Sequence, residues 1–89
     1  MNIFDDLIKL ARVRKTKPVE DSYTNKLLRD KSLSKAKVLE EIKELIEAVE
    51  KDTNKIHEAA DVFYHLIMYL EANNIKIEDV MSELKKRQK

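Results

Sequence analysis

The feature of this sequence that most restricts its fold is the absence of glycine. Its 89 residues include a single proline, Pro18. Hairpins and tight turns between strands depend on glycine, proline and a few polar residues, so a sheet of several short strands would lack its turns. Hydrophobic residues make up 43% and charged residues 39%, a mixture typical of amphipathic helices. The sequence therefore predicts an all-α fold.

Length and charge narrow the classes of protein further. Residues 1–89 predict one small domain. The 18 basic and 17 acidic residues give a net charge of +1, which argues against a nucleic-acid-binding protein. The absence of cysteine excludes disulfides and thiolate metal sites. No apolar run approaches the ~20 residues of a membrane span, and no signal peptide is apparent, so we expect no membrane partner and a cytoplasmic location.

Apolar residues recur at helical spacing in five segments, which predict a bundle of four to five helices. We expect these helices at about 1–15, 25–30, 35–52, 55–72 and 78–87. Pro18 separates the first two, because proline disfavours helix at the preceding residue and lacks a backbone N–H. The first three helices have candidate caps, whose side chains can accept a hydrogen bond from a free backbone N–H. These are Asn2 for the first, Ser22 or Asp21 for the second and Ser34 for the third.

The two longest predicted helices each carry an apolar stripe. In segment 35–52 this stripe consists of Val38, Leu39, Ile42, Leu45, Ile46 and Val49. In segment 55–72 it consists of Ile56, Ala59, Ala60, Phe63, Leu66, Ile67 and Leu70. Stripes of this width usually face a hydrophobic core, so we expect both to be buried inside the bundle.

Carboxylates on the same two helices form a second pattern. Glu40, Glu41 and Glu44 lie within one helical turn of each other in segment 35–52 and so gather on one side of the helix. Glu58 and Asp61 repeat this spacing in segment 55–72, where an aspartate in the middle of an apolar helix is a poor helix former. Like charges at this spacing repel each other, and a bound cation would offset the repulsion.

Two such acidic faces brought together would suit Mg²⁺, which takes a few carboxylates together with phosphate oxygens of a substrate. The residues alone therefore predict a magnesium site for a phosphate-bearing substrate. The alternative is an exposed face rich in Glu and Lys that only keeps the protein soluble. His65 follows Asp61 by one turn, where it would either donate a hydrogen bond that supports this ligand or serve as a packing residue.

Several runs of residues in this order and spacing resemble a known family. They are residues 20–28 with Ser22-Tyr23-Thr24, residues 37–45 with Glu40-Glu41, residues 58–66 with Glu58-Ala59-Ala60-Asp61, then residues 77–80 and Leu84. Over roughly residues 20–87 the sequence resembles the phosphoribosyl-ATP pyrophosphohydrolase family. The resemblance implies the all-α fold of the MazG-like nucleotide pyrophosphatases, a Mg²⁺ cofactor and an oligomer.

The resemblance also implies an activity. Phosphoribosyl-ATP would be hydrolysed between its α and β phosphates to phosphoribosyl-AMP and pyrophosphate, the second step of histidine biosynthesis. Leu39 stands where members of the family usually have glycine, so a house-cleaning pyrophosphohydrolase acting on another nucleoside triphosphate is the first alternative. A non-catalytic helical dimerisation module is the second alternative.

The resemblance further assigns roles to individual side chains. The implied metal ligands are Glu41, Glu44, Glu58 and Asp61. The implied catalytic residues are Glu40, Glu41 and Glu44, with Glu40 either a further ligand or the base that orients water. The implied substrate-binding residues are Ser22, Tyr23, Thr24, Lys26 and Lys37. For the first three the alternative is a helix cap, and for the two lysines it is an ordinary solvated surface.

A homodimer is expected for two reasons. A domain of this size cannot easily enclose a substrate with several phosphates and two riboses. The chain also holds more apolar side chains than one layer of helices needs to bury, among them Leu10, Val13, Met68 and Tyr69. We therefore expect segments 35–52 and 55–72 to pack against a second copy across a two-fold axis.

Overall fold

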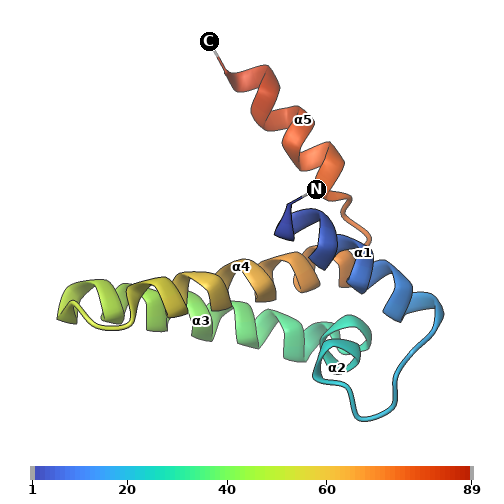
Figure 1. The fold of residues 1–89 in the computed structure, drawn as a ribbon, viewed down its shortest axis with the longest axis horizontal. Helices are drawn as coiled ribbons and strands as arrows, with labels where there is room; N and C mark the ends of the chain where they lie inside the picture. The colour runs from blue at the N-terminus through green and yellow to red at the C-terminus, as the bar shows by residue number, and fades with distance from the viewer. Residues whose placement is uncertain (1, 89) are drawn as a thin grey trace.

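The computed structural model describes residues 2–88, and its regular secondary structure in that range is entirely helical. In chain order the helices are α1 (Ile3–Thr16), α2 (Tyr23–Arg29), α3 (Lys31–Lys51), α4 (Lys55–Ala72) and α5 (Ile77–Arg87). The predicted all-α fold is confirmed. Figure 1 shows α3 and α4 side by side as a long hairpin, with α1 and α2 packed at one end and α5 projecting away from the rest.

The caps of α1 and α2 form as predicted. The Asn2 side chain accepts a hydrogen bond from the backbone N–H of Asp5 at 3.0 Å. The Ser22 hydroxyl accepts one from the backbone N–H of Asn25 at 3.3 Å. Each satisfies a donor that the first helical turn leaves free. Because Ser22 is the cap, α2 begins at Tyr23, before the predicted start at residue 25.

The predicted cap of α3 is wrong. Asp30 caps this helix in place of Ser34, and its carboxylate accepts a hydrogen bond from the backbone N–H of Leu33 at 3.0 Å. Asp30 also ends α2, so the two helices meet at a single residue instead of across a loop. Aspartate and serine are about equally good helix caps. Asp30 comes first in the chain and sets the start of α3, so Ser34 lies inside the helix, where it is buried.

Aspartate and asparagine take the backbone positions that glycine often fills. Among residues 2–88, those with positive φ are Asp21, Asp52, Asn54 and Asn74, at 66°, 56°, 41° and 58°. Their short polar side chains tolerate this left-handed region because they can hydrogen-bond locally. They lie before α2, between α3 and α4, and after α4, which explains how a chain without glycine makes its turns.

A small core lies where α1 and α2 pack against α4. Its buried side chains are Ala11, Leu27, Leu28, Ile67 and Met68. Leu27 and Met68 are fully buried, so Met68, which we expected to be surplus to the core, is at its centre. Burying such a side chain contributes roughly 1.5–3 kcal/mol relative to leaving it exposed, and this core therefore fixes α1 and α2 on the hairpin.

Most of the apolar stripe of α3 faces solvent, so the prediction that the stripe is buried is wrong for four of its six residues, while Val38 and Leu45 are half-buried. Leu39, Ile42, Ile46 and Val49 are 62%, 40%, 54% and 56% exposed. The buried residues of α3 are Ser34, Glu41 and Ala48. Periodicity identifies a face that is suited to burial, but it does not identify the neighbour that covers it. Helix α4 covers a different side of α3 from the one expected.

Helix α4 departs from the prediction in the same way. Ile56, Phe63 and Leu66 are 87%, 52% and 39% exposed, and Ala60 is exposed as well. Ile67 is buried as predicted. The buried side chains of α4 are Val62, His65, Ile67, Met68, Glu71 and Ala72. The covered face is therefore rotated from the apolar stripe toward a face that includes polar residues.

The overall shape is open for a chain of this length. The radius of gyration is 14.1 Å, compared with the ~12 Å expected of a compact domain of this size. Helix α5 contributes to this openness, because none of its residues is buried. A single copy thus leaves large apolar side chains of α3, α4 and α5 in water, and contiguous patches of that kind usually mark an interaction surface.

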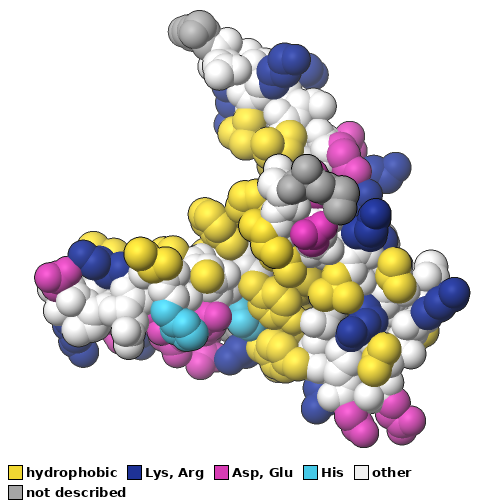
Figure 2. Space-filling view, in the orientation of Figure 1, with side chains coloured by type: hydrophobic (Ala, Val, Ile, Leu, Met, Phe, Trp, Pro, Cys, Tyr) yellow, Lys and Arg dark blue, Asp and Glu magenta, His cyan; other side chains and the backbone are white. Residues whose placement is uncertain are grey.

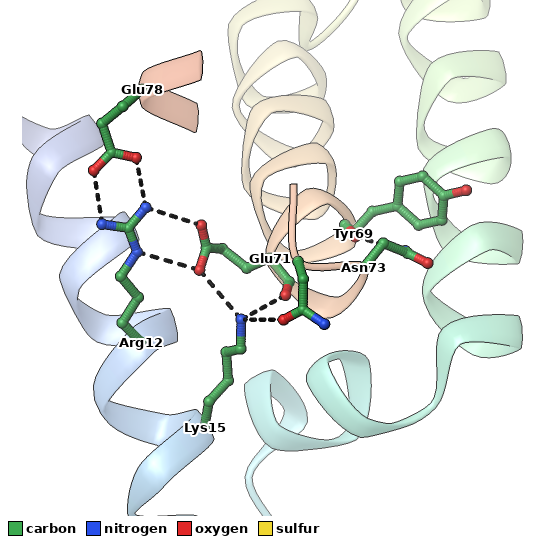
Figure 3. A network of polar contacts seen from close by, with 7 residues as sticks. Arg12, Lys15, Tyr69, Glu71, Asn73 and Glu78 are labelled. Carbon is green, nitrogen blue, oxygen red and sulfur yellow. Dashed lines mark hydrogen bonds and ion pairs between the residues drawn. The ribbon is translucent and has the colours of Figure 1, made fainter. Parts of the chain in front are cut away.

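An ion-pair network joins the start of α5 to α1 and to the end of α4 (Figure 3). The Arg12 guanidinium donates to Glu78 at 2.8 and 2.6 Å and to Glu71 at 3.4 and 3.3 Å. The Lys15 ammonium donates to the backbone carbonyl of Glu71 at 2.7 Å. Glu71 is only 3% exposed, and these two cations compensate its buried charge. The network fixes the point at which α5 leaves the other helices.

Glu78→Gln is expected to destabilise the protein near neutral pH but not in strong acid. Arg12 holds the pKa of Glu78 at about 2, below its ordinary value of 4.5. A lowered carboxylate pKa stabilises the fold above the ordinary value, and this contribution is lost as the pH falls from 4.5 to about 2. The melting temperature of the variant, followed by circular dichroism, should lie slightly below wild type at pH 7 and converge with it in acid. The effect is small because Glu78 is exposed.

Glu83→Gln is the matched control for this measurement. Glu83 pairs with Arg87 inside α5 at 3.0 Å and does not connect α5 to another helix. Its melting temperature should follow wild type across the same pH range. If Glu78→Gln also follows wild type at neutral pH, the contact between Arg12 and Glu78 does not stabilise the fold.

Candidate metal centre

Acidic side chains gather on both helices of the hairpin. On α3, carboxylate oxygens of Glu40, Glu41 and Glu44 lie within 4.8 Å of one another. On α4, ligand atoms of His57, Glu58 and Asp61 lie within the same distance of one another. Figure 2 shows acidic side chains beside the histidine side chains on one face of the molecule. Each helix thus presents a compact group of candidate ligands.

Glu41 connects the two groups. Its side chain lies at the covered face of α3 and is 6% exposed. Burial, the adjacent Glu44 carboxyl and the charge of Asp61 together raise the pKa of Glu41 to about 7, while Lys37 opposes the shift. Asp61 belongs to the α4 group, so its effect on the pKa of Glu41 indicates that the α4 group lies near the α3 group. A carboxylate in this environment binds a proton or another cation more readily than an exposed carboxylate does.

Glu58 has a buried oxygen that lacks a partner. Burial raises the pKa of Glu58, and the carboxylates of Glu44 and Asp61 raise it further, while His57 lowers it. Its Oε2 atom is buried and has no hydrogen-bond partner within residues 2–88. A buried carboxylate oxygen without a partner is unfavourable, and coordination of a metal ion would satisfy it.

The donor set of this cluster fits a hard divalent cation. The carboxylates concerned are those of Glu41, Glu44, Glu58 and Asp61. Mg²⁺ prefers such oxygen ligands, and its charge would offset the repulsion among them. The structure therefore places the four predicted ligands in two groups, one on α3 and one on α4, whose charges act on each other. Their binding of a metal stays a prediction.

Glu40 and Lys37 lie at the rim of the cluster. Lys37 Nζ donates to Glu40 Oε2 at 3.0 Å, and Glu40 is more exposed than Glu41. Lys37 is also close enough to Glu41 to affect its pKa, so its ammonium stands next to the acidic groups. Lys26 differs, because it is exposed on α2 and none of the ion pairs found in residues 2–88 connects it to the cluster.

The residues Ser22, Tyr23 and Thr24 have three different environments. Ser22 caps α2 and also accepts a hydrogen bond from Arg14 at 2.7 Å, as the capping alternative expects. Thr24 is buried, and its hydroxyl forms a hydrogen bond with the hydroxyl of Tyr64. Tyr23 is 44% exposed, so it is the most accessible of the three to a ligand.

His65 donates to the backbone of Asp61 and not to its carboxylate. His65 Nδ1 lies 2.7 Å from the Asp61 backbone oxygen. The Asp61 carboxylate lies instead 3.4 Å from Nε2 of His57. Sequence reasoning missed His57, although its spacing of one turn from Asp61 was the signal that could have found it.

These observations define a class of protein, an all-α chain in which an antiparallel helix pair assembles carboxylates into a cluster suited to a divalent cation. A profile of the family described as phosphoribosyl-ATP pyrophosphohydrolase matches residues 4–88. The chain belongs to this family of hydrolases. The predicted family is therefore confirmed, and the match begins well before the residues that carried the resemblance.

Named relatives cover nearly all of the chain. A phosphoribosyl-ATP pyrophosphatase of Clostridium acetobutylicum is 44% identical over 90 residues, which span 96% of this chain and 80% of that protein. One from Listeria monocytogenes is 40% identical over 89 residues, 97% of this chain and 85% of that protein. A histidine biosynthesis bifunctional protein of Pyrococcus furiosus is 39% identical over 90 residues, 100% of this chain and 43% of that protein. No solved structure matches the chain.

The helices give one further result on the membrane question. None of those in residues 2–88 combines the length and the hydropathy that crossing a bilayer requires.

Proposed function

We propose that this protein hydrolyses phosphoribosyl-ATP to phosphoribosyl-AMP and pyrophosphate, the second step of histidine biosynthesis, with Mg²⁺ as cofactor. Family membership and relatives named phosphoribosyl-ATP pyrophosphatase support the substrate. The observation that carries the metal is the buried, unpartnered oxygen of Glu58 next to Glu44 and Asp61. A substrate made from ATP also favours a cytoplasmic location.

The proposed metal ligands are Glu41, Glu44, Glu58 and Asp61. When bound, Mg²⁺ polarises a phosphoryl oxygen and neutralises charge on the departing pyrophosphate. The carboxylates contribute by being held close together before the ion arrives. Because they come from two helices, the packing of α3 on α4 sets the distance between them. Burial of Glu41 keeps bulk water away from this side of the cluster.

Glu40 is the proposed group that orients the attacking water. It is exposed at the rim, where its carboxylate accepts a hydrogen bond from Lys37. A substrate phosphate that binds Lys37 would release this carboxylate, which is then free to accept a proton from water. Lys37 is thus the phosphate-binding lysine that the geometry supports best, and Lys26 would contact a phosphate farther from the cluster.

A homodimer is part of the proposal. The exposed stripes on α3 and α4 include Ile42, Ile46, Ile56 and Phe63. If α3 and α4 of two copies pair across a two-fold axis, four helices enclose these side chains, as in a helical bundle. The stripes that the sequence predicted to be buried would then be buried by the partner instead of by the same chain.

The position of Leu39 does not favour a different substrate. Its side chain is 62% exposed and belongs to the outer stripe of α3. Glu41, two residues later, points to the opposite side of the helix because each residue turns by about 100°. The leucine that replaces the glycine usual in the family therefore does not obstruct the carboxylates.

Release of pyrophosphate from phosphoribosyl-ATP, measured with and without Mg²⁺, tests this function. We expect turnover with Mg²⁺ and its loss after chelation, and growth of a histidine-requiring strain that lacks this step should be restored. ATP and the deoxynucleoside triphosphates serve as comparison substrates. Faster hydrolysis of one of these would support the house-cleaning alternative, and the absence of turnover on all of them would contradict a catalytic role.

A further inference from the structure

The side chains of Tyr23 and His65 form a hydrogen-bonded chain that ends at Asp61. The Tyr23 hydroxyl lies 2.8 Å from His65 Nε2, and His65 Nδ1 lies 2.7 Å from the backbone oxygen of Asp61. His65 is 6% exposed. The rings of Tyr23 and Tyr64 pack edge-on against its imidazole, with centroids 5.7 and 5.1 Å away. The imidazole therefore has little freedom to turn over.

For a neutral imidazole, this geometry fixes which ring nitrogen carries the proton. A backbone carbonyl oxygen only accepts hydrogen bonds, so His65 Nδ1 must carry a proton in order to bond to Asp61. In the neutral imidazole, Nε2 is then an acceptor, and the Tyr23 hydroxyl must donate its single proton to it. The Tyr23 oxygen keeps a free lone pair but has no proton left for a ligand.

Tyr23 is placed where it can meet the substrate. It is 44% exposed at the start of α2. Burial raises the pKa of Tyr23, and the charges of Lys37 and Glu41 also act on it, which places the phenol beside the acidic cluster. A nucleotide whose phosphates bind at the acidic groups would bring its adjoining part close to the Tyr23 side chain.

We propose that His65 is a positioning residue that holds Tyr23 as a hydrogen-bond acceptor for a sugar hydroxyl of the nucleotide. The proposal rests on the function proposed above. Ionised phosphates only accept hydrogen bonds, so they cannot use the oxygen that His65 leaves free. Ribose hydroxyls are donors, and the ribose is bonded to the α phosphate at which hydrolysis occurs. The adenine amino group also donates, but the whole ribose separates it from that phosphate.

Nuclear magnetic resonance on wild-type protein tests the direction of the hydrogen bonds without substrate. Long-range ¹H–¹⁵N spectra distinguish protonated from unprotonated imidazole nitrogens, and His57→Gln assigns the two histidines. We expect His65 to be protonated at Nδ1 and unprotonated at Nε2, and Tyr23→Phe should shift the Nε2 resonance. A proton on His65 Nε2 in wild type would overturn the proposal, because Tyr23 would then be free to donate.

Kinetics with modified substrates test the contact with the sugar. Tyr23→Phe should lower kcat/KM for phosphoribosyl-ATP by about tenfold, the value of one hydrogen bond. With wild type, the analogue that lacks the contacted hydroxyl of the ATP ribose, either the 2′-deoxy or the 3′-deoxy form, should show a similar decrease in kcat/KM. With Tyr23→Phe, this analogue and phosphoribosyl-ATP should have the same kcat/KM. Tyr69→Phe is the matched control, since Tyr69 lies on α4 near Asn73, at the end of the helix shown in Figure 3, and should keep full activity.

His65→Leu should reproduce the loss caused by Tyr23→Phe, and the double variant should be no worse than either. An undiminished effect of His65→Leu in the Tyr23→Phe background would overturn the positioning role. Each deoxy analogue lowers kcat/KM by some factor relative to phosphoribosyl-ATP. If, for both analogues, this factor is the same in Tyr23→Phe as in wild type, the contact with the sugar is overturned. Wild-type protein that is inactive on phosphoribosyl-ATP would contradict the proposed function instead, and the resonance measurement would still decide the role of His65.

Discussion

Asp61→Asn is expected to lower the rate of Mg²⁺-dependent pyrophosphate release by roughly 10³-fold, because a catalytic metal ion supplies several kcal/mol of charge stabilisation. The amide keeps the size of the side chain and removes the charge that binds the ion. The charge of Asp61 helps to raise the pKa of both Glu41 and Glu58, so its removal relieves repulsion inside the cluster. The metal-free variant should therefore melt no lower than wild type.

The matched control for Asp61→Asn is Glu50→Gln. Glu50 is an exposed acid near the end of α3, and the substitution changes the net charge equally without touching the cluster. It should keep full activity. Full activity of Asp61→Asn would contradict the assigned metal site, and loss of helix content by circular dichroism would assign Asp61 a structural role instead.

Ile46→Glu is expected to convert the protein from a dimer to a monomer. Ile46 is 54% exposed and lies within the outer stripe of α3. In the proposed dimer this position is buried, and burying an unpaired carboxylate costs several kcal/mol, which raises the dissociation constant by roughly 10³-fold or more. Light scattering at micromolar concentration should give twice 10.5 kDa for wild type and 10.5 kDa for the variant.

Val19→Glu provides the comparison for Ile46→Glu. Val19 is 47% exposed, close to the value for Ile46, but it lies between α1 and α2 and outside both stripes. This variant should remain a dimer. Wild-type protein that runs as a monomer would contradict the homodimer, and a dimeric Ile46→Glu would place the interface on another surface.

Helix positions in this protein could be predicted because the signals that set them are local. Helix α4 spans Lys55–Ala72, the segment 55–72 that apolar spacing predicted. The start of α3 shows the limit of such signals, since Asp30 and Ser34 are both good caps and their spacing does not rank them.

Which face each helix buries could not be predicted from periodicity. The stripe that contains Leu39 and Ile46 has the same spacing whether it packs in its own chain or against a second copy. The covered face of α3 holds Glu41, and burial of a carboxylate runs against the usual preference for apolar residues. Spacing along the helix groups Glu41 with Glu44, but it does not show that α4 covers this acidic side of α3.

In the candidate site, contacts within one helix could be predicted from the sequence, whereas contacts between helices could not. The grouping of Glu41 with Glu44, and of Glu58 with Asp61, follows from spacing along one helix. The proximity of Asp61 to Glu41 depends on how α4 packs on α3, and the partner of His65 is Tyr23 on α2. The contact between His57 and the Asp61 carboxylate lies within α4, so its spacing of one turn could have predicted it.

Thermal unfolding with and without Mg²⁺, at matched ionic strength, tests most directly whether α3 and α4 assemble a cation site. A ligand that binds only the folded state stabilises it by about 2.7 kcal/mol at a concentration 100 times its dissociation constant. We predict that Mg²⁺ raises the melting temperature of wild type by several degrees and leaves that of Asp61→Asn unchanged. Equal melting temperatures of wild type with and without Mg²⁺ would contradict the metal centre.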